Sequence, residues 1–586
     1  MNFLNPIYTE KRECQDCYKC LRNCPVKAIK VEGGYASVIP ELCILCGYCV
    51  EVCPNGAKRV RDDLPHARQL FGLKPRVLVS LAPSFVSEFP ELRPGQLIQA
   101  LKKLGFFGVS ETALGAQQVS AQAAAALHSQ PGRVFFSSAC PTVVSYLQKH
   151  RPDDSRFLTG LLSPLLTHCK MLRQQFGPDI GVVFIGPCIA KKLEAAAHPE
   201  LLDVALTFDD LRRWLEQEKL TPETLRENED DQFVPESSAE GAWYPVDGGM
   251  IAGMKSICAV NDGSFMSFSG IPAIEKAITG LGEPAPEGGL FLELLACEGG
   301  CVNGPSALKR HGTATKRCRV LRYARPPAIA LPRQSNLDIQ SVFAVAAPAA
   351  EKYPEAQIRE ALRLVGKVSR DDEIDCGGCG YDTCREFAAA LIRQKAERAM
   401  CVTYMRKLAL KKANALIQKM PSAVVIVNDA MRILEFNTAF AAMVGKNAPR
   451  GAAQAPPQLE GVMLSELVPF ASLFHSVLKS GEDILDRDLR HQHTILHAAI
   501  FTIEKHCVVG GILQDITEPA VRKAEVIRKA QEVIQRSLAT TQKIACLLGE
   551  NAAESEITLN SIIESFSPAK PDEAKSDHDW RKLYRR

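Results

Sequence analysis

The sequence predicts a multidomain protein with a large α/β body, a small cysteine-rich module before it, and an α+β domain and helices after it. The length of 586 residues suggests about four domains of about 150 residues each. Short apolar stretches alternate with helical ones, as in RVLVSLAP, GRVFFSSACP, GVVFIGPC, DVALT and GLFLELLAC. Such alternation favours a mainly parallel sheet covered by helices. The third observation is the 21 cysteines, many of them in closely spaced runs.

Composition narrows the possible classes of protein. Hydrophobic residues make up 46% and charged residues 23%, which is ordinary for a soluble globular chain. A net charge of +3 does not predict a basic surface for nucleic acid. No apolar stretch reaches the length that spans a bilayer. The first residues lack a secretory signal, so we expect a cytoplasmic protein without nucleic-acid or membrane partners. Cytoplasmic thiols stay reduced, which makes metal ligation the expected role of most cysteines.

Two cysteine runs lie near the amino terminus. Each reads C-x2-C-x2-C-x3-C-P, the bacterial ferredoxin pattern in which the fourth cysteine serves the other cluster. This predicts a two-cluster ferredoxin module over residues 1–64, with one [4Fe-4S] cube on Cys14, Cys17, Cys20 and Cys53 and a second on Cys43, Cys46, Cys49 and Cys24. Zinc is the alternative, but zinc sites use C-x2-C pairs without a third cysteine and a proline.

Three strands of the α/β body run directly into cysteines. These are Cys140, Cys188 and Cys297, and Cys301 follows shortly after the last. Sites in open α/β sheets lie at the carboxyl ends of strands, so four thiolates from three loops predict a buried cluster site. Taken singly, each of these residues is also typical of an inert buried thiol.

The motifs around these cysteines resemble the [FeFe]-hydrogenase family. SSACP, GPCIAKKLE and LACEGGCVNG are similar to its three signature segments, and SLAPS and ALKKLGFFGVSETALGA to its approach segments. The resemblance covers residues 1–325 and implies a hydrogenase domain over residues 74–330 that catalyses H2 ⇌ 2H+ + 2e−. It also implies an H-cluster, with a cube held by Cys140, Cys188, Cys297 and Cys301 and a diiron unit, bearing CO and cyanide, bridged through Cys301.

With a single protein bond, the implied diiron unit needs hydrogen bonds and shape to hold it. The ammonium of Lys191 is suited to a cyanide nitrogen, and Glu194 lies on the same helical face to orient it. The second cyanide would lie against Ala82, Pro83 and Ser84, which would form part of the wall of the site and supply hydrogen-bond donors. The alternative for the charged pair is an ordinary surface ion pair.

The sequence departs from hydrogen-producing family members around the implied proton route. Ala139 stands where they have a second cysteine, and the stretch GAQQVSAQAAAALHS contains no acid. Methionines that pack on the diiron unit appear as Gly186 and Leu295, and Pro305 replaces a glycine. We expect slow turnover, because a methyl group passes no proton. A route through water is the alternative.

A third cysteine group follows the body. Cys376, Cys379, Cys384 and Cys401 give C-x2-C-x4-C-x16-C, which resembles a small four-cysteine [4Fe-4S] domain, assigned to residues 350–402. Zinc is the alternative. The stretch REFAAALIRQKAERAM predicts a helix that delivers Cys401 and continues into a helical connector over residues 403–419.

The last part of the chain resembles a sensory region. Residues 420–518 are similar to a PAS domain, in SAVVIVNDAMRILEFNTAFAAMVG and ILHAAIFTIEKHCVVGGILQDITE. C-terminal helices are expected over residues 519–566, where apolar residues recur every three or four positions and predict a homodimer interface. Residues 567–586 are expected to be disordered.

Together these features resemble sensory [FeFe]-hydrogenases, which implies a redox signal passed to a separate partner such as a kinase or phosphatase. One rival is a turnover hydrogenase that exchanges electrons with ferredoxin. Others are an iron-sulfur relay or assembly protein without a diiron unit, and an interaction module that senses redox state through its cubes alone.

Overall fold

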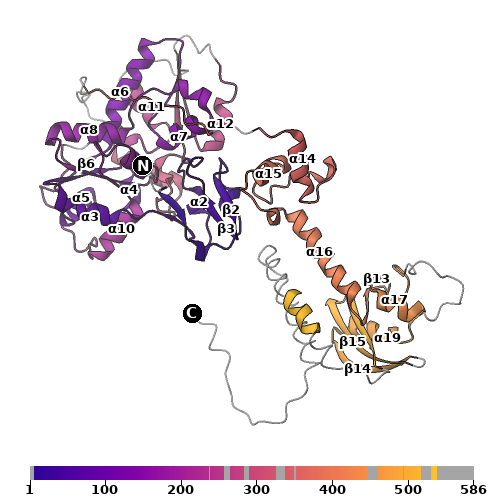
Figure 1. The fold of residues 1–586 in the computed structure, drawn as a ribbon. Coiled ribbons are helices and arrows are strands. Elements are labelled where there is room, and N and C mark those ends of the chain that lie inside the picture. The colour runs from indigo at the N-terminus through magenta and orange to yellow at the C-terminus, as the bar shows by residue number, and fades with distance from the viewer. Residues whose placement is uncertain are drawn as a thin grey trace. The chain divides into compact units, whose positions relative to one another are not determined.

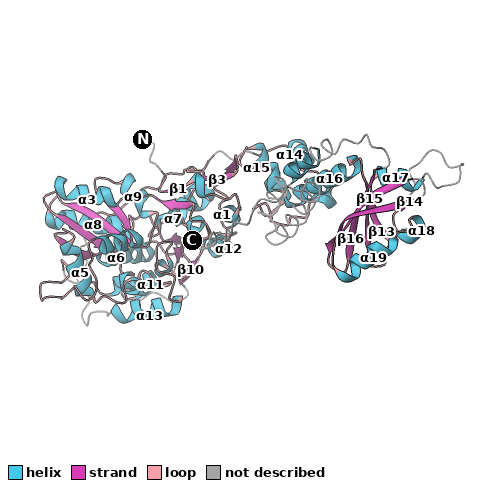
Figure 2. Ribbon diagram, turned by 90° about the horizontal axis from the view of Figure 1, so that it is seen from below, coloured by secondary structure: helices cyan, strands magenta, loops and turns pink. Residues whose placement is uncertain are grey.

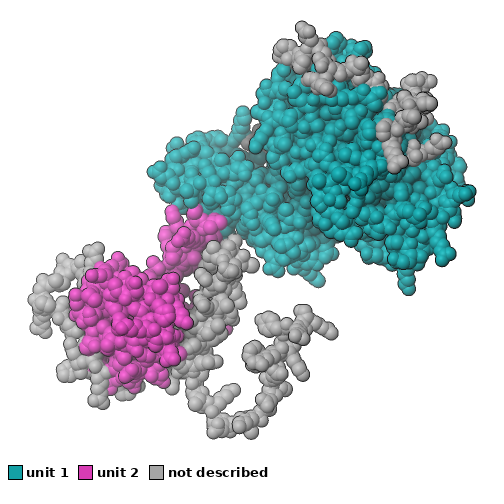
Figure 3. All heavy atoms as spheres, turned by 180° about the vertical axis from the view of Figure 1, so that it is seen from behind, with its two compact units in different colours: residues 1–401 teal, residues 402–586 magenta. Residues whose placement is uncertain are grey.

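The chain folds into two compact units, Met1–Cys401 and Val402–Arg586 (Figure 3). The computed structural model describes residues 5–235, 238–256, 264–282, 289–324, 337–348, 352–445, 459–491, 494–516 and 529–537. The expected tail at 567–586 and most of the expected helices at 519–566 lie outside these residues. Among the described helices, none is long and apolar enough to cross a membrane.

The amino-terminal module is framed by two antiparallel strand pairs. β1 pairs with β4 and β2 with β3, and Ile7 lies opposite Val60, so the beginning and end of the module meet. The cysteine runs lie between and beside these pairs, on short helices and loops. Its elements are β1 (Ile7–Thr9), η1 (Lys11–Glu13), α1 (Lys19–Arg22), β2 (Ile29–Glu32), β3 (Tyr35–Val38), α2 (Tyr48–Glu51) and β4 (Lys58–Val60).

The body contains two separate parallel sheets (Figures 1 and 2). The first has the order β6-β5-β8-β9 and the second β10-β11-β7, with every described pairing parallel. Most of these strands are buried along their whole length, as expected where helices cover both faces. The predicted α/β character is confirmed, whereas the division into two sheets was not predicted. The strands are β5 (Val77–Leu81), β6 (Gly108–Glu111), β8 (Gly181–Gly186), β9 (Val204–Thr207), β7 (Val134–Phe136), β10 (Phe265–Ser269) and β11 (Leu290–Leu295).

Helices pack around both sheets and bury two apolar clusters, one mainly against each sheet. Several begin with a proline in the first turn, where its missing N–H is not needed. They are α3 (Leu64–Leu73), α4 (Phe85–Glu88), α5 (Pro94–Lys103), α6 (Ala113–Ser129), α7 (Pro141–His150), η2 (Pro152–Phe157), α8 (Pro164–Phe176), α9 (Lys191–Ala197), α10 (Phe208–Gln217), η3 (Glu240–Trp243), α11 (Gly249–Lys255), α12 (Ile271–Ile278), η5 (Cys301–Asn303) and α13 (Thr313–Tyr323).

His168 of α8 ties that helix to the first sheet. Its ring nitrogens lie 2.8 Å from the Ser80 hydroxyl and 2.9 Å from the Ser110 hydroxyl, and its side chain is fully buried. Burial lowers the pKa of His168 to about 3. The folded protein therefore holds this imidazole neutral, although an exposed one titrates near pH 6.5.

His168 should make the fold acid-sensitive. Its stabilising effect is complete above about pH 6.5 and is lost as pH falls from there towards about 3, because only the unfolded chain takes up the proton. We expect a loss of about 1.4 kcal/mol in unfolding free energy at pH 5.5. Pulse proteolysis at pH 7.5 and 5.5 measures it, with His168→Gln as the comparison. An equal loss in the variant would assign the sensitivity to other groups.

The last part of the first unit is a small helical domain. Its elements pack over a core that includes Ile358, Leu362 and Ala388. They are α14 (Glu355–Arg363), η6 (Arg370–Asp372), α15 (Cys384–Ile392) and η7 (Arg398–Met400).

The expected continuous helix from α15 to the connector is wrong. α15 ends at Ile392, Gln394 has a φ of +55°, and α16 (Val402–Lys419) begins only after Cys401. The intervening backbone turns towards the amino-terminal module, where Lys395 O accepts a hydrogen bond from Val31 N. In a continuous helix the Lys395 carbonyl would accept from an N–H of the same helix. Its hydrogen bond to Val31 replaces that interaction and favours the break between α15 and α16.

The second unit holds a five-stranded antiparallel sheet in the order β13-β12-β16-β15-β14. Asn437, fully buried, donates to the carbonyls of Ile417 and Ser422 and so ties the end of α16 to the sheet. The remaining elements are β12 (Ala423–Asn428), β13 (Ile433–Phe436), α17 (Thr438–Gly445), α18 (Leu464–Leu467), α19 (Ala471–Ser480), β14 (Ile484–His491), β15 (Thr494–Glu504), β16 (Val508–Asp515) and a helix over 529–537.

Candidate functional site

Four cysteines converge at the carboxyl ends of strands from both sheets of the body. β7, β8 and β11 end at residues 136, 186 and 295, just before Cys140, Cys188 and Cys297, while Cys301 opens η5. Cys140 is also the residue that precedes α7, whose first position is Pro141. The site therefore lies where the two sheets meet, which explains how loops far apart in sequence reach it.

The thiols of this set lie within electrostatic range of one another. Burial raises the pKa of Cys188 to about 11, with Cys140 adding to the rise and Lys191 opposing it. Burial likewise raises the pKa of Cys301 and Cys297, with the other cysteines of the set as further causes. The thiols of Cys188, Cys297 and Cys301 are thus protonated at neutral pH, and any metal they bind must displace those protons.

A buried ammonium lies beside the thiols. Lys191 Nζ donates to Glu194 Oε2 at 2.6 Å and to Ser163 Oγ at 3.1 Å, and Lys191 is 8% exposed. Burial opposes its charge, but Glu194 and Cys188 outweigh burial and raise the pKa of Lys191. The ammonium has a third donor beyond these two acceptors. Sequence reasoning missed Ser163. The only signal in the sequence is its position directly before a proline that can begin a helix.

The segment after β5 carries a polar atom without a partner. Ala82, Pro83 and Ser84 are buried, and Ala82 N donates to Ile185 O, which holds the segment against β8. Ser84 is 2% exposed and its hydroxyl has no hydrogen-bond partner. A buried hydroxyl without a partner costs about 1–3 kcal/mol, so this atom fits a site completed by a bound group.

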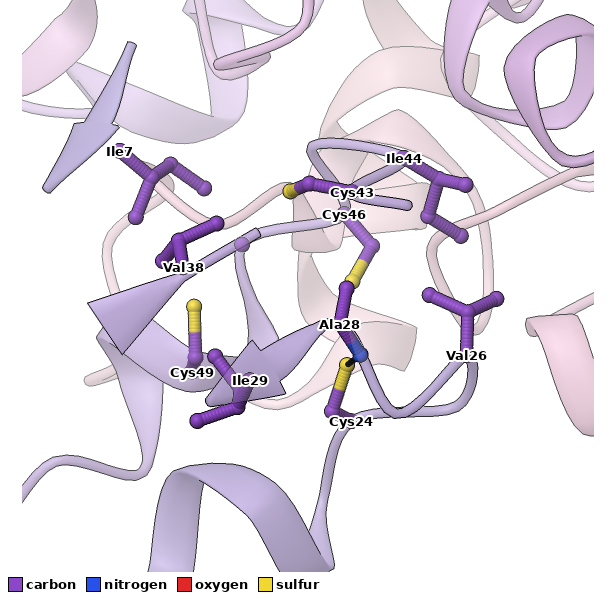
Figure 4. Close-up of a pocket in the computed structure, with 11 residues that line it drawn as sticks. Ile7, Cys24, Val26, Ala28, Ile29, Val38, Cys43, Ile44, Cys46 and Cys49 are labelled. Carbon is purple, nitrogen blue, oxygen red and sulfur yellow. Dashed lines mark hydrogen bonds between the residues drawn. The ribbon is translucent and has the colours of Figure 1, made fainter. Parts of the chain in front are cut away.

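Four cysteines of the amino-terminal module surround one cavity (Figure 4). They are Cys24 from the first run and Cys43, Cys46 and Cys49 from the second, the crossed set that the ferredoxin pattern predicts. The rest of the wall is mostly aliphatic, made by Ile7, Val26, Ala28, Ile29, Val38 and Ile44 with Gly47. Apolar walls with four sulfurs fit a buried [4Fe-4S] cube.

The other crossed set consists of Cys14, Cys17, Cys20 and Cys53, and the described contacts bring only part of it together. Burial raises the pKa of Cys20 to about 11, and both Cys14 and Cys17 act on it. Ala36 N donates to Cys14 Sγ at 3.5 Å. The described hydrogen bond of Cys53 is to its own loop, from Gly56 N to Cys53 O at 3.3 Å, so its place in this set stays a prediction.

The cavity of Figure 4 adjoins the set in the body. Tyr48 Oη donates to Ala296 O at 3.4 Å, and Cys46 is among the causes that raise the pKa of Cys297. A Cβ on Gly47 would come within 2.4 Å of Pro305, so only glycine allows this close approach. The proline that replaces a family glycine is thus part of the contact between module and body.

The third group is also incompletely gathered. Burial raises the pKa of Cys379 to about 11, and Cys401 and Cys376 add to the rise. The described interactions of Cys384 are with Asp375, which accepts from Cys384 N at 2.6 Å. In the described part of the chain, no three ligand side chains are close enough to hold a single metal ion.

The family model "Iron only hydrogenase large subunit, C-terminal domain" matches residues 75–305, the range that contains the four cysteines of the body, Lys191 and Ser84. Residues 75–305 form a domain of the [FeFe]-hydrogenase family. A 4Fe-4S binding domain family matches residues 36–59 and an Fe-S cluster family matches residues 372–403.

Several relatives of this chain are hydrogenases. The NADP-reducing hydrogenase subunit HndD of Solidesulfovibrio fructosivorans is 23% identical, over 53% of this chain and 65% of its own length. Iron hydrogenase 1 of Clostridium pasteurianum is 24% identical, over 42% and 51%. An uncharacterized ferredoxin of Methanocaldococcus jannaschii is 39% identical, over 8% and 79%. The chain thus spans about half to two thirds of the two hydrogenases.

Solved structures are matched at low similarity. The [FeFe]-hydrogenase HydA1 of Chlamydomonas reinhardtii is 18% identical, with a TM-score of 0.37 over 49% of this chain and all of its own. The PAS domain of an HTR-like protein from Haloarcula marismortui is 16% identical, with a TM-score of 0.15 over 19% of this chain and 94% of its own.

Acids are present near the site of this hydrogenase-family domain, although not on the helix where the family pattern suggests them. α6 presents buried Gln117, which donates to Glu240 Oε2 at 3.2 Å. Glu293 of β11 is 1% exposed and accepts from the backbone N–H groups of Met250 and Ile251. Burial raises the pKa of Glu293 to about 8. Sequence reasoning missed both acids, because Glu240 begins η3 and Glu293 lies inside β11, and neither belongs to a cysteine motif.

Proposed function

We propose that the chain is a slow [FeFe]-hydrogenase of sensory type that interconverts H2 with protons and electrons at an H-cluster. The carrying observation is that a four-cysteine set, a buried ammonium and an unpartnered buried hydroxyl meet at the same strand ends. Cys140, Cys188, Cys297 and Cys301 would hold the cube, and Cys301 would bridge to the diiron unit. An iron-sulfur relay without a diiron unit would need neither Lys191 nor Ser84.

Twelve further cysteines would hold three further cubes: one on Cys14, Cys17, Cys20 and Cys53, one on Cys43, Cys46, Cys49 and Cys24, and one on Cys376, Cys379, Cys384 and Cys401. The crossed cavity and the family matches support this assignment.

When bound, the diiron unit supplies the splitting of H2, and the chain supplies its surroundings. Lys191 offers its third donor to an anionic ligand, while Glu194 and Ser163 hold its direction. Ser84 offers a second donor from the opposite segment. The buried apolar residues around these donors exclude water, which strengthens each hydrogen bond.

Infrared spectroscopy on the full chain matured with a diiron precursor tests the proposal. We expect bands of bound CO and cyanide that shift under H2. A matured protein with four cubes and no such bands would reject the hydrogenase and favour an iron-sulfur relay. Iron analysis on the same sample should show four cubes besides the diiron pair, which corresponds to 16 cysteine ligands at four per cube.

Turnover should be slow, because Ala139 offers no thiol and α6 offers no acid. We expect Ala139→Cys to raise the rate by about tenfold, below the roughly 10²–10⁴-fold of a complete general acid–base group, because α6 supplies no acid to continue the route. The hydrogen evolution rate with a chemical reductant measures the change. A wild-type rate that already matches fast hydrogenases would favour a ferredoxin-coupled turnover enzyme instead.

We further propose that the second unit is a PAS domain that passes the redox signal to a separate kinase or phosphatase within a homodimer. α16 follows Cys401 directly, and none of its residues is buried, which is compatible with pairing to a second copy. Its far end is bound to the sheet through Asn437 and through Thr438, which donates to Gln418 O at 3.1 Å.

Hydrogen exchange tests the signalling proposal. Protection of residues 402–420 should differ between H2-reduced and oxidised protein. A complete switch between two helix arrangements needs about 5.5 kcal/mol, and one electron near 4 Å supplies about 4 kcal/mol at an effective dielectric of 20, so we expect a partial change. Identical protection with reduced cubes would leave the second unit as a dimerisation device.

A further inference from the structure

The four-cysteine domain is fixed against the amino-terminal module by several contacts. Besides the hydrogen bond from Val31 N to Lys395 O at 2.9 Å, Gly33 N donates to Glu397 Oε1 at 2.6 Å. Lys27 and Asp382 form an ion pair at 3.4 Å. Backbone, carboxylate and ion-pair contacts from three parts of this domain thus hold it in one position.

The loop that carries Cys379 packs directly on the first ferredoxin helix. Gly380 has a φ of +94°, and a Cβ at this position would come within 2.8 Å of the Leu21 side chain. Leu21 is fully buried and follows Cys20 in α1. This glycine therefore brings the two cysteine-bearing segments into van der Waals contact.

Tyr381 lies in this contact with an unused donor. It is 5% exposed, and its hydroxyl has no hydrogen-bond partner. Its N–H faces the Cys379 thiol, and its ring packs against Phe387 at 5.9 Å between centroids. Burial first, and then the thiols of Cys379 and Cys24, raise the pKa of Tyr381, so both sulfurs lie within electrostatic range of its hydroxyl.

We propose that the four-cysteine domain and the ferredoxin module form one electron path, joined at Tyr381, whose hydroxyl donates to a sulfur of the cube on Cys379 and raises the reduction potential of that cube. A donor to sulfur stabilises the reduced, more negative cube. One electron leaves a cube of the module and reduces the outer cube, while Tyr381 keeps its proton and no bond breaks. The inference uses the cube assignments of the proposed function, but not its hydrogen chemistry.

A redox titration monitored by electron paramagnetic resonance tests the inference on the full chain reconstituted with iron and sulfide. Tyr381→Phe keeps the ring and removes the donor. A hydrogen bond to a charged group contributes about 1.5 kcal/mol or more. We therefore expect about a tenfold change in the ratio of reduced to oxidised outer cube at a given potential. That change corresponds to a fall of about 59 mV in the midpoint potential of one cube. Tyr8→Phe, at an exposed position in β1, is the matched control and should change nothing.

Cys376→Ser identifies the outer cube, because the affected signal should be altered or lost in that variant. Unchanged potentials in a fully loaded Tyr381→Phe protein would overturn the inference. A shift confined to a module cube, or failure of the variant to keep the outer cube, would overturn it as well. Because chemical reductants set the potential, absent CO and cyanide bands would reject the hydrogenase and leave this result standing.

Discussion

Matured Lys191→Met protein is expected to keep its cubes and lose most of its CO and cyanide bands. The substitution keeps the length of the side chain but removes the ammonium that Glu194 and Ser163 direct. A lost charge-assisted hydrogen bond and a lost oriented partner together correspond to about 100-fold weaker retention of the bound group. Infrared band intensity per cube measures retention, and hydrogen turnover should fall in parallel.

Lys103→Met is the matched control for this variant, because Lys103 is an exposed lysine of α5 in the same unit. Glu194→Gln should give an intermediate result, since it keeps a hydrogen-bond acceptor and removes the charge. Full band intensity in Lys191→Met would show that the diiron unit is held without the ammonium.

Lys192→Met, one residue along, is expected to act on the fold. The Lys192 ammonium is fully buried and lies 3.0 Å from both Asp63 and Asp210. Removing one member of a buried ion network costs about 3–5 kcal/mol. We expect about 3 kcal/mol, because Arg61 still pairs with Asp63 and Arg213 with Asp210. Pulse proteolysis at pH 7 measures the unfolding free energy.

The pH dependence of this loss identifies its cause. Although burial opposes it, Lys192 lowers the pKa of Asp210, so the pair stabilises the fold above the ordinary carboxyl pKa and less as pH falls. The difference between wild type and Lys192→Met should therefore shrink as pH falls below about 4. Asp210→Asn in the same chain should recover part of the loss. A constant difference across this range would indicate lost packing instead.

Local pattern predicted five of the seven described strands of the body, because buried parallel strands are continuous apolar runs, but it missed β6 and β10. RVLVSLAP contains β5 and GLFLELLAC contains β11, each followed by a predicted site segment. The same reasoning failed at residues 393–401, where helix propensity was overridden by contacts with a module more than 350 residues away. Local propensity is a weak prior when tertiary contacts compete with it.

The candidate site shows the same limit. Spacing within a motif singled out the ferredoxin cysteines, whereas strand ends and the family resemblance singled out the four cysteines of the body and the Lys191–Glu194 pair. Neither could identify Ser163, Glu293 or the contact between Tyr48 and Ala296, since each joins elements whose adjacency depends on how the two sheets pack.

The convergence of three strand ends also sets an order of biosynthesis. Both ferredoxin runs leave the ribosome within the first 60 residues, so their cubes can be inserted while the rest of the chain is being made. The body set is complete only when Cys301 follows Cys140, a delay of about 8–32 s at about 5–20 residues per second. During that interval Cys140 and Cys188 are incomplete ligand sets. Any assembly factor that loads this site must therefore act after translation of β11 or protect the early thiols until then.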